Sequence, residues 1–168
     1  MPAPTTAIRW TEPEADRKAR VEVIRRAWHD AYAALFEAEE IEAIFNGEIE
    51  MRGTWTKRRS QSAGVLVADA AGEVVGIASL GILEPGVGEV AALYVLPERQ
   101  GKGVGVQLWE ASLSVFRHRA MHHVEVWTLA AAAARKFYEA RGCELVGEGE
   151  FAVADHVLPA VGYAKALD

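Results

Sequence analysis

Residues 93–105 read LYVLPERQGKGVG and are the most informative stretch of the chain. An apolar strand pattern here runs into glycines that open a helical pattern at Gly103. At such a junction several backbone N–H groups point to one spot, the helix dipole adds about half a positive charge, and missing side chains allow close approach. The stretch therefore predicts a cradle for a pyrophosphate, although a tight strand-to-helix turn would use the same glycines.

Two other phosphate loops do not fit the spacing of these glycines. A Walker A loop would need a glycine in place of Leu96 and a hydroxyl residue in place of Gly103. A dinucleotide fingerprint counted from Gly101 would need a glycine in place of Val106. The loop is therefore neither of these nucleotide-binding motifs.

The periodicity of apolar residues around this loop predicts a mixed α/β domain. In chain order it indicates a strand, two helices, three strands, a helix, a strand, a helix and two final strands. Their bounds are 7–10, 14–36, 38–45, 64–69, 74–83, 89–95, 103–119, 123–128, 130–141, 144–154 and 160–165. Strands 64–69 and 74–83 are expected to form a hairpin, Gly142 to end the last helix, and Pro159 to separate the last two strands.

Length and composition limit the classes of protein that this sequence can be. The 168 residues, 51% of them hydrophobic, fit one domain over 1–168 with a single core. Cys143 has no intrachain partner, so a disulfide scaffold is excluded. A net charge of -6 weighs against nucleic acid as a partner. The first residues do not resemble a signal peptide, and no apolar run approaches the roughly 20 residues that cross a bilayer, so we expect a cytoplasmic protein without a membrane partner.

Two motifs around the loop resemble the GNAT acetyltransferase superfamily. Gln100, Gly103 and Gly105 match the pattern Gln/Arg-x-x-Gly-x-Gly/Ala, which is the acyl-CoA-binding loop of that superfamily. The preceding strand of the superfamily begins with Glu and an apolar residue and ends in Leu-Tyr-Val-x-Pro, as Glu89-Val90 and residues 93–97 do here.

A third motif lies downstream, in the helix predicted over 130–141. Four of its positions match the superfamily pattern Asn-x-x-Ala-x-x-Phe-Tyr-x-x-x-Gly-Phe, namely Ala134, Phe137, Tyr138 and Gly142. Two positions depart from it, because Ala131 replaces the Asn and Cys143 the final Phe. The order of elements also agrees, so the resemblance covers roughly Ala7 to Lys165.

The resemblance implies a GNAT acyl-CoA N-acyltransferase fold, with a mixed, mostly antiparallel sheet flanked by helices, and acetyl-CoA as co-substrate. Backbone N–H groups of the loop would hold the pyrophosphate, and the strand before it would pair with the pantetheine arm like an added strand. In the family that strand often splays at a bulge, which frees a backbone N–H to polarise the thioester carbonyl. The implied cofactor-binding residues are Leu93, Tyr94, Val95, Gln100, Gly101, Lys102, Gly103, Val104 and Gly105.

Acetyl transfer to an amine also needs a base and an acid. An alkylamine has a pKa of about 10.4 and is protonated at neutral pH, so a group must take its proton before attack. The resemblance assigns this role to Glu89, although a strand-end glutamate can equally be a solvated cap. It makes Tyr138 the proton donor to the departing CoA thiolate, although a tyrosine at helical spacing is ordinarily structural.

Further residues bear on the acceptor. Glu37 to Glu50 contains six acidic residues and no basic one, which could attract a cationic amine but is more typical of a solvated helix face. By analogy Trp28, Tyr32 and Phe36 would line the acceptor site, and core packing explains them as well. His122 and His123 have no partner ligands at suitable spacing, so we expect no metal site.

We therefore expect an enzyme that moves an acetyl group directly from acetyl-CoA to a primary amine of a small molecule. The pattern of residues 27–32, AWHDAY, resembles small-molecule members of the superfamily. Three alternatives stay open: a protein or peptide Nα-acetyltransferase, a non-catalytic acyl-CoA-binding regulatory module, and a partner in a toxin–antitoxin pair. Pairing of strand edges, which is common in the family, would also allow a homodimer.

Overall fold

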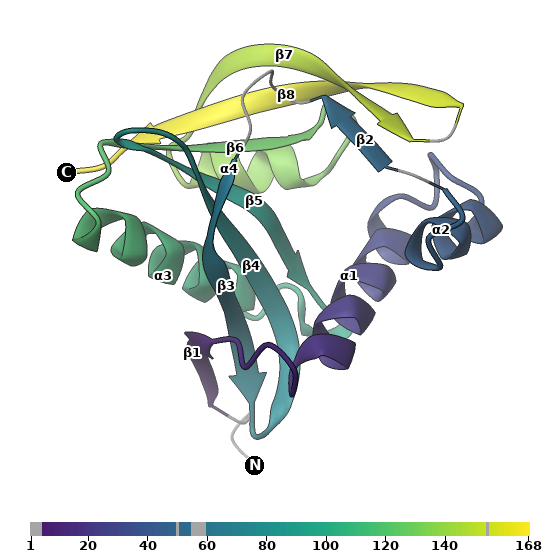
Figure 1. Ribbon diagram of the computed structural model, residues 1–168, viewed down its shortest axis with the longest axis horizontal. Coiled ribbons are helices and arrows are strands. Elements are labelled where there is room, and N and C mark those ends of the chain that lie inside the picture. The colour runs from purple at the N-terminus through teal and green to yellow at the C-terminus, as the bar shows by residue number, and fades with distance from the viewer. Residues whose placement is uncertain (1–4, 50, 55–59, 154) are drawn as a thin grey trace.

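The computed structural model describes residues 5–49, 51–54, 60–153 and 155–168 (Figure 1). Its eight strands form one sheet in the order β1-β3-β4-β5-β6-β8-β7-β2, in which only β5 and β6 are parallel. The strands are β1 Thr6–Trp10, β2 Met51–Thr54, β3 Gln61–Ala70, β4 Glu73–Glu84, β5 Val87–Val95, β6 His123–Leu129, β7 Glu144–Val153 and β8 His156–Ala166. The helices are α1 Arg17–Ala31, α2 Ala38–Phe45, α3 Val104–His118 and α4 Ala134–Ala140, with a short 3-10 helix, η1, at Pro97–Arg99.

The predicted mixed, mostly antiparallel sheet with flanking helices is confirmed. Among these residues, no helix combines the length and apolar character needed to cross a membrane.

Helices α1 and α3 pack against opposite faces of β4 and β5 (Figure 1). On one face Phe116 of α3 lies over Gly88, so closely that an added Cβ would come within 2.5 Å of the ring. On the other face the indole N–H of Trp28 in α1 donates a hydrogen bond of 3.1 Å to the Tyr94 hydroxyl. The central strands are therefore covered on both sides.

A second apolar cluster joins α1 and α2 to the β7–β8 hairpin. It centres on Trp28, whose ring lies 4.9 Å from Tyr32, 5.9 Å from Phe45 and 6.5 Å from Phe151, measured between ring centroids. His156, the first residue of β8, links the hairpin to α2 because its Nε2 lies 2.7 Å from Glu40 Oε2. Aromatic rings thus pack the first two helices against the β7–β8 hairpin.

Arg9 of β1 fastens the start of α1 to the sheet. Its guanidinium lies 2.8 Å from Asp16, which directly precedes α1, and 3.0 Å from Asp69 of β3. The hydrogen bond from Arg9, supported by the backbone N–H of Glu12, holds the pKa of the buried Asp16 well below its usual value. The helix is therefore anchored at one end, and its other end reaches the cleft described below.

Strands β5 and β6 meet over only three residue pairs and then diverge. Val87, Gly88 and Glu89 pair with His123, Val124 and Glu125, and no pairing follows. On its other side β5 stays paired with β4, where the register steps from Leu80–Val90 to Ser79–Ala92. Ala91 is thus the extra residue of a β-bulge, which increases the local twist at the point where the strands separate.

The first helix is shorter than its apolar spacing predicts. It ends at Ala31 instead of continuing to residue 36, and residues 32–36 form turns in which Leu35 and Phe36 donate to the carbonyl of Tyr32. Glu37 is extended and forms a capping box with Glu40 at the start of α2. Tyr32 and Phe36 both pack against Trp28. The helical spacing of apolar residues therefore continues beyond Ala31, although the helix itself has ended.

Pro159 lies inside β8, where the sequence predicted a break. Its carbonyl accepts a hydrogen bond from the Ala130 N–H, just past the last pair of the β6–β8 ladder. The N–H and C=O of one strand residue point to the same side, so the missing N–H of Pro159 falls beyond the end of β6 and costs no bond to β7. The last helix also begins later than predicted, at Ala134, after a turn in which Ala132 donates to Leu129.

Candidate active site

A cleft opens where β5 and β6 diverge. Its main part has a volume of about 560 Å³, and a smaller recess of about 60 Å³ lies between the two strands. Helix α1 contributes Ala27 and Asp30 to its walls, and α4 contributes Ala134 and Phe137. Tyr32, Leu93, Tyr94 and Ala134 line both parts, so the cleft and the recess are neighbours.

The predicted glycine loop forms one end of this cleft. Gly101 and Gly103 have φ angles of +72° and +87°, a conformation that L side chains rarely adopt, and Gly103 is the N-cap of α3 without a side-chain cap. Within the described part of the chain, the N–H groups of residues 101–106 donate no backbone hydrogen bond. The loop therefore presents free donors and the positive end of a helix to the cleft.

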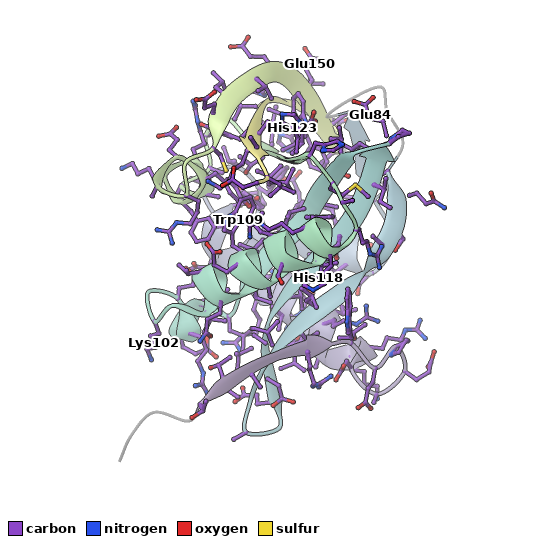
Figure 2. All side chains as sticks on the ribbon, turned by 90° about the vertical axis from the view of Figure 1, so that its left-hand side faces the viewer. Glu84, Lys102, Trp109, His118, His123 and Glu150 are labelled. Atoms are coloured by element: carbon purple, nitrogen blue, oxygen red, sulfur yellow. The ribbon has the colours of Figure 1, made fainter. Side chains whose placement is uncertain are left out.

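Other predicted members of the cofactor set lie in different places. The Gln100 side chain donates a 3.0 Å hydrogen bond to the carbonyl of Val95, which ties the loop to the end of β5. The side chain of Val104 is buried in the core beneath α3, so only its backbone is available. Lys102 is exposed at the tip of the loop (Figure 2) and is not among the lining residues. Leu93, Tyr94, Val95, Gln100, Gly101, Gly103 and Gly105 do line the cleft.

Tyr138 of α4 lies against the recess, only 5% exposed. Its ring packs against Trp109 at 5.6 Å and Phe137 at 5.4 Å between centroids. Burial raises the pKa of the Tyr138 hydroxyl well above its usual value, so the group holds its proton. The hydroxyl of Tyr163 donates to Glu139 and accepts from Arg135, which ties α4 to β8.

Glu89 is also buried, 6% exposed, at the last residue pair before the strands separate. Its neighbour Gly88 faces α3, so alternation along the strand places Glu89 on the face that α1 covers. It directly precedes Val90, which lines the recess, although Glu89 itself is not a lining residue. Glu125 of β6 stands opposite it in the register, a second carboxylate that sequence reasoning did not single out.

Two further tyrosine hydroxyls, those of Tyr32 and Tyr94, interact with each other beside the cleft. The Tyr94 hydroxyl accepts the Trp28 hydrogen bond and also interacts with the Tyr32 hydroxyl. Burial, the largest cause, raises the pKa of Tyr32, and burial likewise raises that of Tyr94. All three tyrosines near the recess are therefore neutral donors at physiological pH.

Sequence reasoning also missed the small residues of the cleft. Ala132, Ala133 and Ala134 line it together, and their methyl groups leave room for a ligand beside β5. The acidic segment predicted on α2 is largely engaged elsewhere, because Glu42 pairs with Arg25 and His29 while Glu40 pairs with His156. A run of alanines carries no distinctive signal, and only the neighbouring Ala134-x-x-Phe137-Tyr138 motif pointed to this wall.

The cleft fits a long ligand with a phosphorylated part and an amide-containing arm. The free N–H groups and absent side chains of the loop suit a pyrophosphate, and an exposed strand edge along residues 92–95 can pair with an extended chain. Tyr138, whose hydroxyl keeps its proton, lines the recess. These are the features that acetyl-CoA would require.

The sequence and the structure resemble known proteins. A sequence model described as the acetyltransferase (GNAT) family matches residues 21–143. An uncharacterized N-acetyltransferase of Bacillus subtilis is 30% identical over 81% of this chain and 79% of its own length. The L-methionine sulfoximine/L-methionine sulfone acetyltransferase of Pseudomonas aeruginosa is 38% identical over a shorter region, 45% of this chain and 47% of that protein.

Solved structures share the fold at lower identity. The PaiA N-acetyltransferase of Thermoplasma acidophilum, in complex with coenzyme A, aligns with a TM-score of 0.72 and 18% identity, covering 94% of this chain and 98% of that chain. A ribosomal-protein-alanine N-acetyltransferase of Brucella melitensis aligns with a TM-score of 0.68 and 23% identity, covering 96% of this chain and 99% of that chain. At these identities the likeness speaks for the fold alone.

Proposed function

Because the chain belongs to the GNAT family of acetyltransferases, whose acyl donor is acetyl-CoA, we propose that it transfers the acetyl group directly to a primary amine of a small molecule. The observation that carries this proposal is the cleft itself. It joins a glycine loop with free N–H groups to a strand edge and then to the buried, protonated Tyr138. Donor binding and proton transfer are thereby assigned to one continuous site.

The donor would be held mainly by backbone groups. The N–H groups of residues 101–106 would bind the pyrophosphate, and the free edge of residues 92–95 would pair with the pantetheine arm. Ala131 offers no hydrogen bond at the family's asparagine position, so the grip on this arm would rely more on β5. Backbone donors also explain how a protein with a net charge of -6 can hold a polyanion.

Two side chains would move protons during the transfer. Acetyl-CoA supplies the acetyl group as a thioester, and an uncharged amine attacks it. Glu89 would take one proton from the protonated acceptor before the attack, directly or through water, and the second proton, which the nitrogen loses as the C–N bond forms, would pass to water. Tyr138 would give a proton to the sulfur as the C–S bond breaks, so that the products are an amide and the free CoA thiol.

A bridge between the α1–α2 segment and the β7–β8 hairpin favours a small acceptor over a protein N-terminus. The α1–α2 segment and the β7–β8 hairpin are bridged by His156–Glu40 and by the Phe36–His156 ring contact at 5.2 Å. A polypeptide acceptor would need an open groove, and a bridge between these two segments leaves less room for one. The small-molecule acetyltransferase among the relatives agrees with this assignment.

The proposal is tested by titrating the protein with acetyl-CoA in a calorimeter and then measuring release of CoA thiol with a panel of amines. The panel contains simple alkylamines, amino acids, aminoglycosides and peptides with free N-termini. We expect binding of acetyl-CoA and thiol release with small amines. Release with peptides alone would support the Nα-acetyltransferase alternative, and binding without any release would support a non-catalytic acyl-CoA sensor. Failure to bind any acyl-CoA would refute the proposal.

A further inference from the structure

Three tyrosines meet around the recess between β5 and β6. Tyr32 follows α1, Tyr94 belongs to β5 and Tyr138 belongs to α4, and all three line the recess. Burial is the largest cause that raises the pKa of Tyr32 and of Tyr138, and the nearby Tyr94 hydroxyl is the next. The three hydroxyls therefore lie within electrostatic reach of one another, beside a recess of about 60 Å³ that holds only a few ligand atoms.

These hydroxyls come from opposite faces of the sheet. Tyr138 packs against Trp109 of α3, at 5.6 Å between ring centroids, which places it on the face that α3 covers. Tyr94 accepts the hydrogen bond of Trp28, a residue of α1, and α1 covers the other face. Groups on the two faces can meet only where β5 and β6 have separated. A thioester in this gap would therefore have Tyr138 on one side and Tyr94 on the other.

The oxygen of Tyr94 accepts two hydrogen bonds. The indole N–H of Trp28 donates one of them over 3.1 Å. The Tyr32 hydroxyl is the second partner: beyond burial, which raises the pKa of both tyrosines, their hydrogen bond raises the pKa of Tyr32 and lowers that of Tyr94, as expected when Tyr32 is the donor. A hydroxyl that accepts from both partners must direct its own proton elsewhere. The proton of Tyr32 is thus in use, whereas that of Tyr94 is not.

The proton of Tyr94 has no acceptor among residues 5–49, 51–54, 60–153 and 155–168. The hydrogen bonds of its hydroxyl with these residues are the two that it accepts, from Trp28 and Tyr32. Polar groups inside a protein are nearly always hydrogen-bonded, so an unused donor indicates a missing partner. Because Tyr94 lines the recess, a ligand bound there can supply that partner.

We propose that the Tyr94 hydroxyl donates a hydrogen bond to the carbonyl oxygen of the acetyl group, as a donor that Tyr32 and Trp28 hold in place. When the amine attacks, the electron pair of the C=O bond moves to this oxygen, and a donor already aimed at it stabilises the charge. The pair returns as the C–S bond breaks, so Tyr94 keeps its proton throughout while Tyr138 gives one to the sulfur. This inference rests on the proposed function, because it presumes that the thioester lies in the recess.

The first test measures the infrared carbonyl band of acetyl-CoA, isotope-labelled at the carbonyl carbon and bound to the protein without an amine. A hydrogen bond weakens the C=O bond, so Tyr94→Phe should move the band to a higher wavenumber than in the wild type. Tyr32→Phe keeps the Tyr94 hydroxyl but removes a donor that polarises it, so its band should lie between the other two. A band at the wild-type position in Tyr94→Phe would overturn the proposal.

The second test measures turnover with one alkylamine. In Tyr94→Phe kcat should fall roughly thirtyfold, less than the hundredfold or more that is typical of a lost oxyanion donor, because a backbone N–H of β5 would remain. Tyr32→Phe should lower kcat by a smaller factor. The double variant should be no slower than Tyr94→Phe, because Tyr32 acts only through Tyr94. An unchanged kcat in Tyr94→Phe, or a double variant that loses the product of the two factors, would contradict these roles.

Tyr163→Phe is the matched control for both measurements. Tyr163 is a buried tyrosine whose hydroxyl bonds to Arg135 and Glu139, and it is not among the residues that line the recess. Its variant should keep the wild-type band and the wild-type kcat. An equal shift of the band in Tyr94→Phe and in this control would assign the shift to a general change of packing and overturn the proposal.

Binding of acetyl-CoA separates failure of this inference from failure of the proposed function. If the wild type binds acetyl-CoA but acetylates no amine, the carbonyl band still decides the point, because it requires no turnover. If Tyr94→Phe is unfolded by circular dichroism, Tyr32→Phe decides it: a band at higher wavenumber supports the inference, and an unmoved band overturns it. A wild type that binds no acyl-CoA would refute the proposed function and this inference together.

Discussion

The two stretches of β5 on either side of Ala91 differ in the number of their partners. Val87 to Glu89 pair with β4 on one side and β6 on the other, whereas residues 92–95 pair with β4 alone. The first stretch lies in the middle of the sheet and holds Glu89 buried. The second has become an edge, although it lies at the centre of the molecule (Figure 1).

An internal edge is unusual because unpaired backbone groups are costly to bury. Here the cost is avoided because a cleft lies along the edge, so water or a ligand can satisfy the free groups. The bulge at Ala91 and the short β5–β6 contact therefore leave backbone N–H and C=O groups free to bind a ligand. In many other pockets polar side chains fill this role. The fully paired stretch should govern proton removal, and the free edge should govern donor binding and release.

The largest effect is expected in the paired stretch, from Glu89→Gln. Loss of the base should lower kcat/KM at neutral pH by about a hundredfold or more. The deficit should shrink as pH rises toward the amine pKa of about 10.4, because more of the amine is then already neutral. A pH–rate profile of both proteins with one alkylamine measures this. Glu144→Gln, a change of an exposed carboxylate in β7, serves as control and should leave the profile unaltered.

A smaller loss is expected from Tyr138→Phe, because Tyr138 of α4 lines the recess beside the free edge. A CoA thiol has a pKa near the 8.5 of cysteine and leaves readily, so an acid matters less than a base, and kcat should fall roughly ten- to a hundredfold. Because burial keeps Tyr138 protonated, the loss should be the same from about pH 7 to about pH 9. A kcat within twofold of wild type at every pH would contradict the acid role.

Tyr163→Phe is the matched control for that experiment. Tyr163 is equally buried, and its ring centroid lies 6.3 Å from that of Tyr138, but its hydroxyl bonds to Arg135 and Glu139 and does not line the cleft. Its loss should lower the free energy of unfolding by about 1 kcal/mol and leave kcat close to wild type. A similar fall in kcat in both variants would mean that Tyr138 acts only by packing.

The fold could be predicted from the sequence where the signal is local. The hairpin of β3 and β4 and the loop before α3 follow from apolar periodicity interrupted by turn residues, and both are present. The end of α1 could not be predicted, because Tyr32 and Phe36 keep helical spacing to reach Trp28 after the helix has stopped. Strand β2 was also missed, since its pairing with β7 depends on a segment far away in the chain.

The site was predictable only in its parts that form motifs. The glycine loop and the Phe137-Tyr138 pair can be recognised from the sequence alone, because each belongs to a short motif. The bulge at Ala91 is not, because Val90, Ala91 and Ala92 read as ordinary strand residues and the register step depends on β4.

A moderate loss of acetyl-CoA affinity is expected from Gly103→Ala, in the loop that follows the free edge. Gly72→Ala is its matched control. Both glycines have positive φ, +87° and +91°, and an added Cβ would meet nothing within 4 Å at either. Each change should therefore lower stability in urea unfolding by a similar amount, about 1–2 kcal/mol. Only Gly103→Ala should weaken acetyl-CoA binding in calorimetry, by roughly tenfold, because its methyl group lies beside the free N–H groups of the loop. Equal affinities in the two variants would show that the loop is merely a turn.

The smallest effect is expected from Cys143, which lies in the core outside both stretches of β5. Burial raises the pKa of its thiol to about 11, so below that pH the thiolate is scarce and the group is a poor nucleophile. Relative to an ordinary thiol, a thiol reagent near pH 8 should label the folded protein roughly a hundredfold more slowly, and the rate should climb as pH rises toward 11. Cys143→Ala should keep the wild-type kcat, because direct transfer needs no acyl-cysteine. Rapid labelling of the folded protein together with loss of activity would instead indicate a covalent route through this residue.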